Sequence, residues 1–167
     1  MITTTGLITT VVPGIALTAC TITDLRSRRI PNAVTVPLAG AGLLVNLAAT
    51  CVHPATSAVG FRSALLGLVA CFGVMLVFHV LAGYGAGDVK LAAAIGAWVG
   101  VEAGLLCIAQ ASILAGLVGL GGLLTRLAAR LLRRPAAAAE PGIPLAPCFA
   151  AAWGLLQLGQ APGGLPW

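Results

Sequence analysis

The sequence contains two aspartates, Asp24 and Asp88, and each stands at the edge of a long apolar run. Two carboxyl groups held within a few ångströms cannot both ionise cheaply, so one keeps a proton while the other stays charged. Such a pair can hydrolyse a peptide bond, because the charged group deprotonates a water and the protonated group donates to the scissile carbonyl. Asp24 and Asp88 are therefore the candidate catalytic residues, provided that the fold brings them together.

Asp24 begins the stretch Asp-Leu-Arg-Ser-Arg-Arg-Ile-Pro-Asn, which ends at Asn32. The simplest interpretation of this stretch is a membrane boundary, where arginines anchor the interface and Asp24 is an incidental partner for one of them. Pro31 is well placed to open the next helix, because its missing N–H does no harm in a first turn. Taken alone, this signature fits a boundary as well as it fits a catalytic site.

Asp88 lies in the stretch Gly-Tyr-Gly-Ala-Gly-Asp-Val-Lys-Leu, residues 83–91. An aspartate that follows glycines and precedes an apolar run is typical of a helix N-cap, a role compatible with catalysis. Gly85 and Gly87 remove side-chain bulk where the extended backbone of a substrate could approach. A helix N-terminus and the nearby Lys90 both favour the anionic form of Asp88. Nucleotide binding is not indicated, because no strand precedes the glycines and no P-loop Lys-Ser/Thr follows them.

The composition predicts the elements that must position these acids. Of the 167 residues, 59% are hydrophobic and 8% are charged, and the mean hydropathy is +1.06, values far from those of a soluble domain. A membrane-crossing helix takes about 20 residues, so we expect one all-α membrane bundle, a single domain over residues 1–167, with about six spans. The apolar segments are Leu7 to Thr23, Ala33 to Cys51, Ser63 to Ala82, Val89 to Val101, Ala103 to Leu124, and Ile143 to Gln160.

The basic residues are unevenly distributed between these segments. Eight lie in the odd-numbered connections and only Arg62 lies in an even-numbered one; the eight are Arg26, Arg28, Arg29, Lys90, Arg126, Arg130, Arg133 and Arg134. By the positive-inside rule the odd connections are cytoplasmic and both termini lie outside. Asp24 opens the first cytoplasmic loop and Asp88 lies in the second, so topology places both acids at one membrane face. The net charge of +5 is thereby explained without a nucleic-acid partner.

Several other features narrow the interpretation. The five cysteines form no Cys-x-x-Cys pair, so neither a metal site nor another cofactor is expected. The few serines lie outside any Gly-x-Ser-x-Gly turn, and His79 is close enough to the glycine-rich stretch to bond there, although a satisfied interior histidine is the simpler interpretation. Ala92, Gly96 and Gly100 form a small-residue stripe, which predicts a buried, central fourth helix. Residues 135–147, rich in alanine and proline, are expected to form a cytoplasmic loop.

These motifs together resemble the type IV prepilin peptidases, membrane aspartic endopeptidases of the G-x-G-D class. The resemblance is carried by Asp24 with Ile30-Pro31-Asn32, by the stretch from Gly85 through Asp88 to Leu91 continuing to Gly96 and Gly100, and by Ile143-Pro144-Leu-Ala-Pro147. It implies that Asp24 and Asp88 are the catalytic pair, with Gly85, Gly87 and Lys90 at the substrate. The implied substrates are pilin or pilin-like precursors, cleaved at the inner face of the cytoplasmic membrane.

The chain also departs from the longer members of that family. It lacks the cytoplasmic segment with paired Cys-x-x-Cys motifs that is associated with N-methylation, so it is closer to the short tight-adherence (Flp) form, with archaeal preflagellin peptidases as the second choice. Two other functional classes stay open: a proton-coupled transporter, since intramembrane acids commonly relay protons, and a non-catalytic component of a secretion apparatus. The sequence leaves the oligomeric state open.

Overall fold

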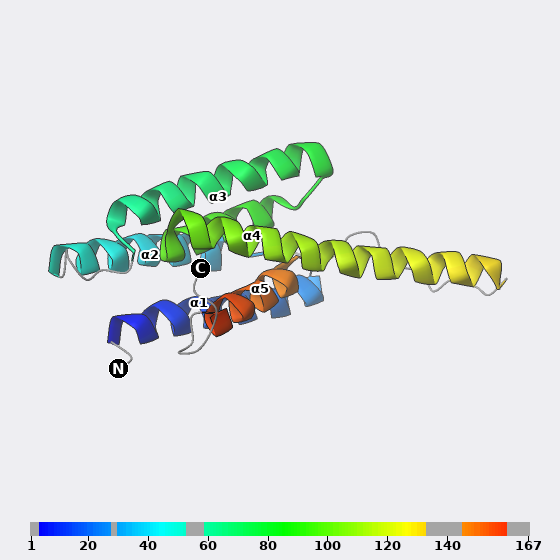
Figure 1. Ribbon diagram of the computed structural model, residues 1–167, viewed down its shortest axis with the longest axis horizontal. Coiled ribbons are helices and arrows are strands. Elements are labelled where there is room, and N and C mark those ends of the chain that lie inside the picture. Colours follow the sequence, from blue (N-terminus) through cyan, green and yellow to red (C-terminus); the bar gives the residue numbers. More distant parts are fainter. Residues whose placement is uncertain (1–3, 28–29, 53–58, 133–144, 160–167) are drawn as a thin grey trace.

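The structure is a computed structural model that describes residues 4–27, 30–52, 59–132 and 145–159. It contains five helices, and its described residues include no strand: α1 (Thr4–Ser27), α2 (Asn32–Val52), α3 (Phe61–Ala82), α4 (Ala86–Leu131) and α5 (Ala146–Gly159). Helix α4 lies in the centre, because it contacts each of the other four helices (Figure 1). The predicted all-α bundle is thus confirmed.

Four of the helices, α1 to α4, are long and apolar enough to cross a membrane, and α5 is a shorter apolar helix. The expected number of about six spans is therefore slightly more than the structure shows. The difference arises at the predicted fourth and fifth segments, which both belong to α4. Large apolar side chains such as Leu44, Leu66 and Ile113 point outward, as expected for surfaces that face lipid.

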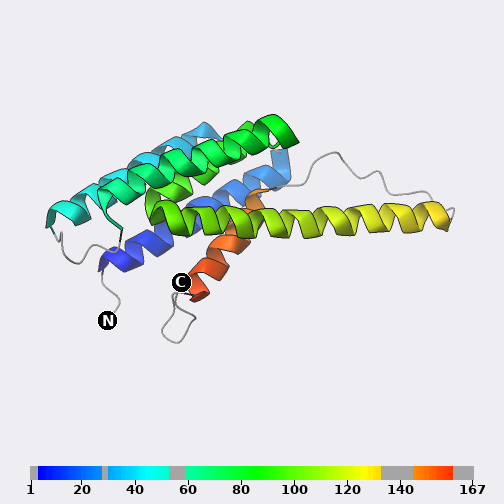
Figure 2. The same ribbon diagram turned by 45° about the horizontal axis from the view of Figure 1, so that its top comes forward.

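Helix α4 is divided at Gly100, whose φ of 80° and ψ of −171° are not helical. In a continuous helix, residues eight apart lie about 12 Å apart along the axis. A Cβ added to Gly104 would instead lie 3.2 Å from the Cα atom of Gly96. The chain therefore doubles back at Gly100, and α4 consists of a short first arm and a longer second arm that extends beyond the bundle (Figure 2).

The first arm of α4 is the buried element that its small residues predict. Residues 91–98 are all buried, and Gly96 packs against Gly67 of α3 so closely that a Cβ on either glycine would lie within 2.4 Å of the other's carbonyl oxygen. Lipid gives membrane helices no hydrophobic drive to associate, so close backbone packing of this kind holds them together. The predicted central position of this segment is confirmed.

A buried asparagine of α2 donates hydrogen bonds to the backbone carbonyl groups at the end of that first arm. The last carbonyls of a helix lack partners in the next turn, and an unsatisfied carbonyl is costly in an apolar surrounding. Asn46, which is 3% exposed, donates from its side-chain amide to the carbonyl oxygens of Ala97 (3.0 Å) and Trp98 (3.3 Å). The Trp98 indole N–H in turn donates to the Leu38 carbonyl oxygen at 2.8 Å. Helix α2 thereby fixes the bend in α4.

Asp24 lies within a helix and not in a loop. Asp24 was expected to open a loop, but α1 continues to Ser27, so the aspartate belongs to a helix. This prediction was wrong because the apolar run ends at Thr23, whereas the helix continues through polar residues to Ser27. Most of the expected loop over residues 135–147 lies outside the described residues, as do Arg28, Arg29, Arg133 and Arg134.

Candidate active site

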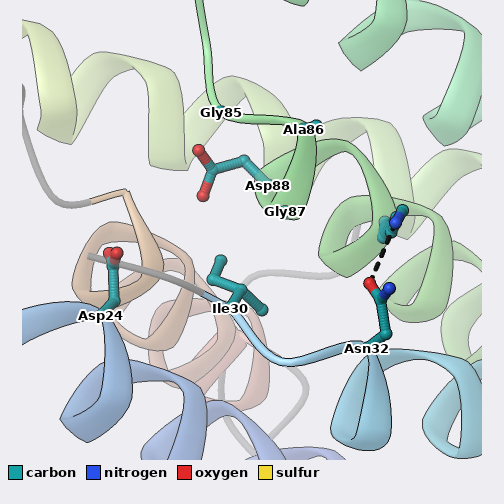
Figure 3. Close-up of a pocket in the computed structure, with 8 residues that line it drawn as sticks. Asp24, Ile30, Asn32, Gly85, Ala86, Gly87 and Asp88 are labelled. Atoms are coloured by element: carbon teal, nitrogen blue, oxygen red, sulfur yellow. Dashed lines mark hydrogen bonds between the residues drawn. The ribbon is translucent and has the colours of Figure 1, made fainter. Parts of the chain in front are cut away.

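Helix ends that are far apart in the sequence meet around one pocket of about 320 Å³. The end of α1, the start of α2 and the start of α4 supply its walls (Figure 3). All five residues singled out from the sequence line it, and the full lining is Asp24, Ile30, Asn32, Gly85, Ala86, Gly87, Asp88 and Lys90. The fold therefore brings both aspartates together, as the sequence predicts, and places their carboxyl groups on facing walls.

Asp24 is buried near the end of α1, with 8% of its surface exposed. Its carboxyl group interacts electrostatically with that of Asp88 across the pocket. One Asp24 oxygen, Oδ2, accepts a hydrogen bond of 3.2 Å from the backbone N–H of Ala146 at the start of α5. This contact could not be predicted from the sequence, because the two residues are 122 positions apart. The donor is a backbone amide, which every residue except proline has, so no residue type indicates it.

Asp88 lies in the first turn of α4 but is not its N-cap, which corrects the expectation drawn from its position before the apolar run. The N-cap is Gly85, whose backbone is extended with φ −65° and ψ 139°. The Asp88 N–H donates to the Gly85 carbonyl oxygen at 3.0 Å. The helix therefore begins before the aspartate, and this leaves the Asp88 carboxyl group free to face the pocket (Figure 3).

The two glycines of the motif have different neighbours. A Cβ at Gly85 would lie 2.8 Å from the Oδ2 atom of Asp88, whereas a Cβ at Gly87 would lie 2.9 Å from the Cβ of Ile30. Both separations are too short for non-bonded carbon and oxygen atoms. Gly85 thus leaves room for the catalytic candidate, and Gly87 lets α4 approach the segment between α1 and α2.

Lys90 connects the two sequence signatures directly. Its ammonium group donates a hydrogen bond of 2.9 Å to the side-chain oxygen of Asn32 (Figure 3). Lys90 and Asn32 are both exposed at one side of the pocket. The contact holds α4 beside the start of α2, and it directs the positive charge of Lys90 toward Asn32.

The turn that leads into Asp88 is fastened to the end of α3. Gly83 adopts a left-handed conformation with φ 72°, and its N–H donates to the His79 carbonyl oxygen at 3.1 Å. The His79 ring nitrogen Nδ1 is hydrogen-bonded to the carbonyl oxygen of Tyr84, and the Tyr84 ring lies 5.9 Å from that of Phe78. His79 therefore bonds to the glycine-rich stretch, which was one of the two interpretations of this residue.

The arrangement has the parts needed for general acid–base hydrolysis. Two carboxyl groups share a pocket large enough for water and an extended backbone, so one can accept a proton from water while the other donates one. Within the ranges that the structure describes, no three His, Cys, Asp or Glu side chains are grouped so that they could hold a metal ion.

The part of the chain that forms this pocket is similar in sequence to known proteins. The model of the type IV leader peptidase family matches residues 11–120, which include both aspartates. The chain is 43% identical over 83 residues to a prepilin leader peptidase/N-methyltransferase of Klebsiella pneumoniae, covering 48% of this chain and 35% of that protein. It is 33% identical over 110 residues to the enzyme of that name from Aeromonas hydrophila, covering 66% and 38%. The chain thus spans less than two fifths of these relatives. No solved structure matches it.

Proposed function

Because this chain belongs to the type IV leader peptidase family, we propose that it is a membrane-embedded aspartic endopeptidase that removes the leader peptide from type IV prepilins of the Flp-like kind. The observation that carries this proposal is the meeting of Asp24 and Asp88 in one pocket. The proposed activity is peptide cleavage. The relatives' names also include N-methyltransferase, but the matches cover only 35% and 38% of their length.

The proposed reaction needs only the two carboxyl groups and a water. The ionised aspartate takes a proton from the water as the water oxygen attacks the scissile carbonyl carbon. The protonated aspartate gives its proton to the carbonyl oxygen, which forms a neutral tetrahedral diol. As the diol collapses and the C–N bond breaks, the amine takes the proton held by the aspartate that activated the water. A diol hydroxyl gives its proton to the other aspartate, so the pair again holds one proton and the product is a carboxylic acid.

The substrate is proposed to enter from the cytoplasmic side of the inner membrane. The helix ends around the pocket carry basic residues: Arg26 near the end of α1 and Lys90 near the start of α4. Arg62 lies at the start of α3, whereas it is the end of α3 that leads into the pocket. The positive-inside rule then orients the pocket toward the cytoplasm and puts both termini outside. A prepilin whose apolar helix lies in the bilayer would present the junction with its basic leader at this level.

Processing of a co-expressed prepilin tests the proposal. Asp24→Asn and Asp88→Asn each keep the side-chain volume but remove the titratable group, so each variant should lose cleavage by at least about 10³-fold. Glu102→Gln is the matched control, because Glu102 is an exposed acid of α4 outside the pocket, and it should cleave like the wild type. Cleavage retained by either aspartate variant, at normal protein levels in the membrane, would refute the mechanism.

A further inference from the structure

The start of α5 donates a hydrogen bond to one of the two acids, from the Ala146 N–H to the Asp24 carboxyl group. Leu145 is the residue before α5, and its carbonyl oxygen accepts the first helical bond, from the Phe149 N–H at 3.0 Å. Ala146 is therefore the first residue of the helix, and its N–H has no partner within α5. That N–H is used instead across the bundle, on a carboxyl group of α1.

We propose that the Ala146 N–H is a positioning group that keeps Asp24 in the ionised state, so that Asp24 is the residue that activates water and Asp88 is the residue that donates the proton. This inference rests on the proposed function and adds the assignment of the two roles. It reverses the sequence-based expectation that Asp88 is the anion.

The surroundings of Asp24 explain why it needs this donor. Asp24 lies in the final turns of α1, where the helix dipole opposes a negative charge, and it is buried. A backbone N–H from the positive end of a second helix offsets both effects. Among the residues that the structure describes, the other titratable groups that interact electrostatically with Asp24 are Cys20 of α1, Asp88 of α4 and Cys148 of α5, and none of these three is a cation.

The surroundings of Asp88 fit the opposite role. The basic side chain that lines the same pocket, Lys90, donates a hydrogen bond to the neutral side chain of Asn32, which holds its ammonium group there. Asp88 faces Asp24 across the pocket (Figure 3). Burial of the Asp88 carboxyl group and the negative charge of Asp24 both favour the protonated form of Asp88, and together they outweigh the opposing hydrogen bond from the Gly85 backbone.

Substitution of Ala146 by proline tests the assignment. Proline lacks the N–H but is favoured at the first position of a helix, so Ala146→Pro removes the bond to Asp24 and leaves the bonds of α5 intact. The acid limb of the pH profile of kcat/KM should move to higher pH by about one unit, and activity should recover as the pH rises. Ala146→Gly keeps the N–H, so its acid limb should stay in place.

A second measurement does not depend on the folding of the proline variant. In wild-type protein in detergent micelles, the Ala146 amide proton should exchange slowly with solvent, because it is bonded to Asp24. The Asp24→Ala variant should lose that protection, whereas Asp88→Ala should keep it. Fast exchange in the wild type, or an unshifted acid limb in folded Ala146→Pro, overturns the inference. Neither result affects the proposed function, which fails only if the asparagine variants of the two acids still cleave.

Discussion

At the scale of single residues, the space around Asp88 limits which side chain can stand at position 85. The side of Gly85 that would carry a Cβ faces the carboxyl group of the aspartate, at a distance of 2.8 Å from Oδ2. The backbone of Gly85 has φ −65°, which any residue adopts. The glycine is therefore required by its contact with the acid and not by its backbone angles.

This contact gives a prediction for Gly85→Ala. The added methyl group must push the Asp88 carboxyl group aside, and a displacement of about 1 Å can lower the rate about 10²-fold. We expect kcat to fall by about that factor, while the midpoint of thermal unfolding changes little because Gly85 is exposed. Gly40→Ala is a control, since a Cβ at Gly40 meets nothing within 4 Å. A fully active Gly85→Ala enzyme would contradict the described position of Asp88.

Helix α3 and the first arm of α4 are held together by close backbone contact. Gly67 and Gly96 touch through their backbones, and the second arm of α4 returns past the first after the bend at Gly100. These contacts place the start of α4 beside the end of α1. The position of Asp88 therefore depends on packing well away from the pocket.

Two glycines of α3 provide a matched test of this packing. A Cβ at Gly67 would lie 2.4 Å from the Gly96 carbonyl oxygen, whereas a Cβ at Gly73 meets nothing within 4 Å. Gly67→Ala should lower the free energy of unfolding by about 3 kcal/mol, and Gly73→Ala should leave it unchanged or raise it by up to about 1 kcal/mol. Denaturation by SDS in mixed micelles measures both values. Equal effects of the two substitutions would show that the α3–α4 contact is not close.

The sequence allowed much of this element arrangement to be predicted, but not its long-range contacts. Apolar runs located α2 and α3 to within a few residues, and the small residues of the first arm of α4 indicated its burial. The reversal at Gly100 falls beside the predicted break between Val89 to Val101 and Ala103 to Leu124, but hydropathy does not show how closely the two arms of α4 would pack after it. The hydrogen bond between Ala146 and Asp24 was missed for a related reason, since it depends on where two distant helices end.

At the scale of the whole molecule, the orientation in the membrane decides which compartment the pocket faces. The native cysteines offer a direct test, because Cys51 near the end of α2 is exposed while Cys20, Cys71, Cys107 and Cys148 are buried. Cys51 lies at the end of α2 that is far from the pocket. By the positive-inside rule it should therefore be outside the cytoplasm.

We expect a membrane-impermeant maleimide to label the wild-type protein at Cys51 in intact spheroplasts, and Cys51→Ser to abolish the labelling. In the Cys51→Ser background, Arg126→Cys should be labelled only in inverted membrane vesicles, because Arg126 is exposed on the far part of α4 at the opposite face. The reverse pattern of labelling would place the pocket outside the cytoplasm and would contradict the proposed route of the substrate.

The bond between the first turn of α5 and Asp24 has a consequence for the order of biosynthesis. A ribosome that has translated as far as Leu131 has already made both aspartates, yet the amide that orients one of them has not been synthesised. The Asp24 carboxyl group therefore gains its backbone hydrogen bond only after α5 has been synthesised, so the surroundings of this acid are completed late in translation.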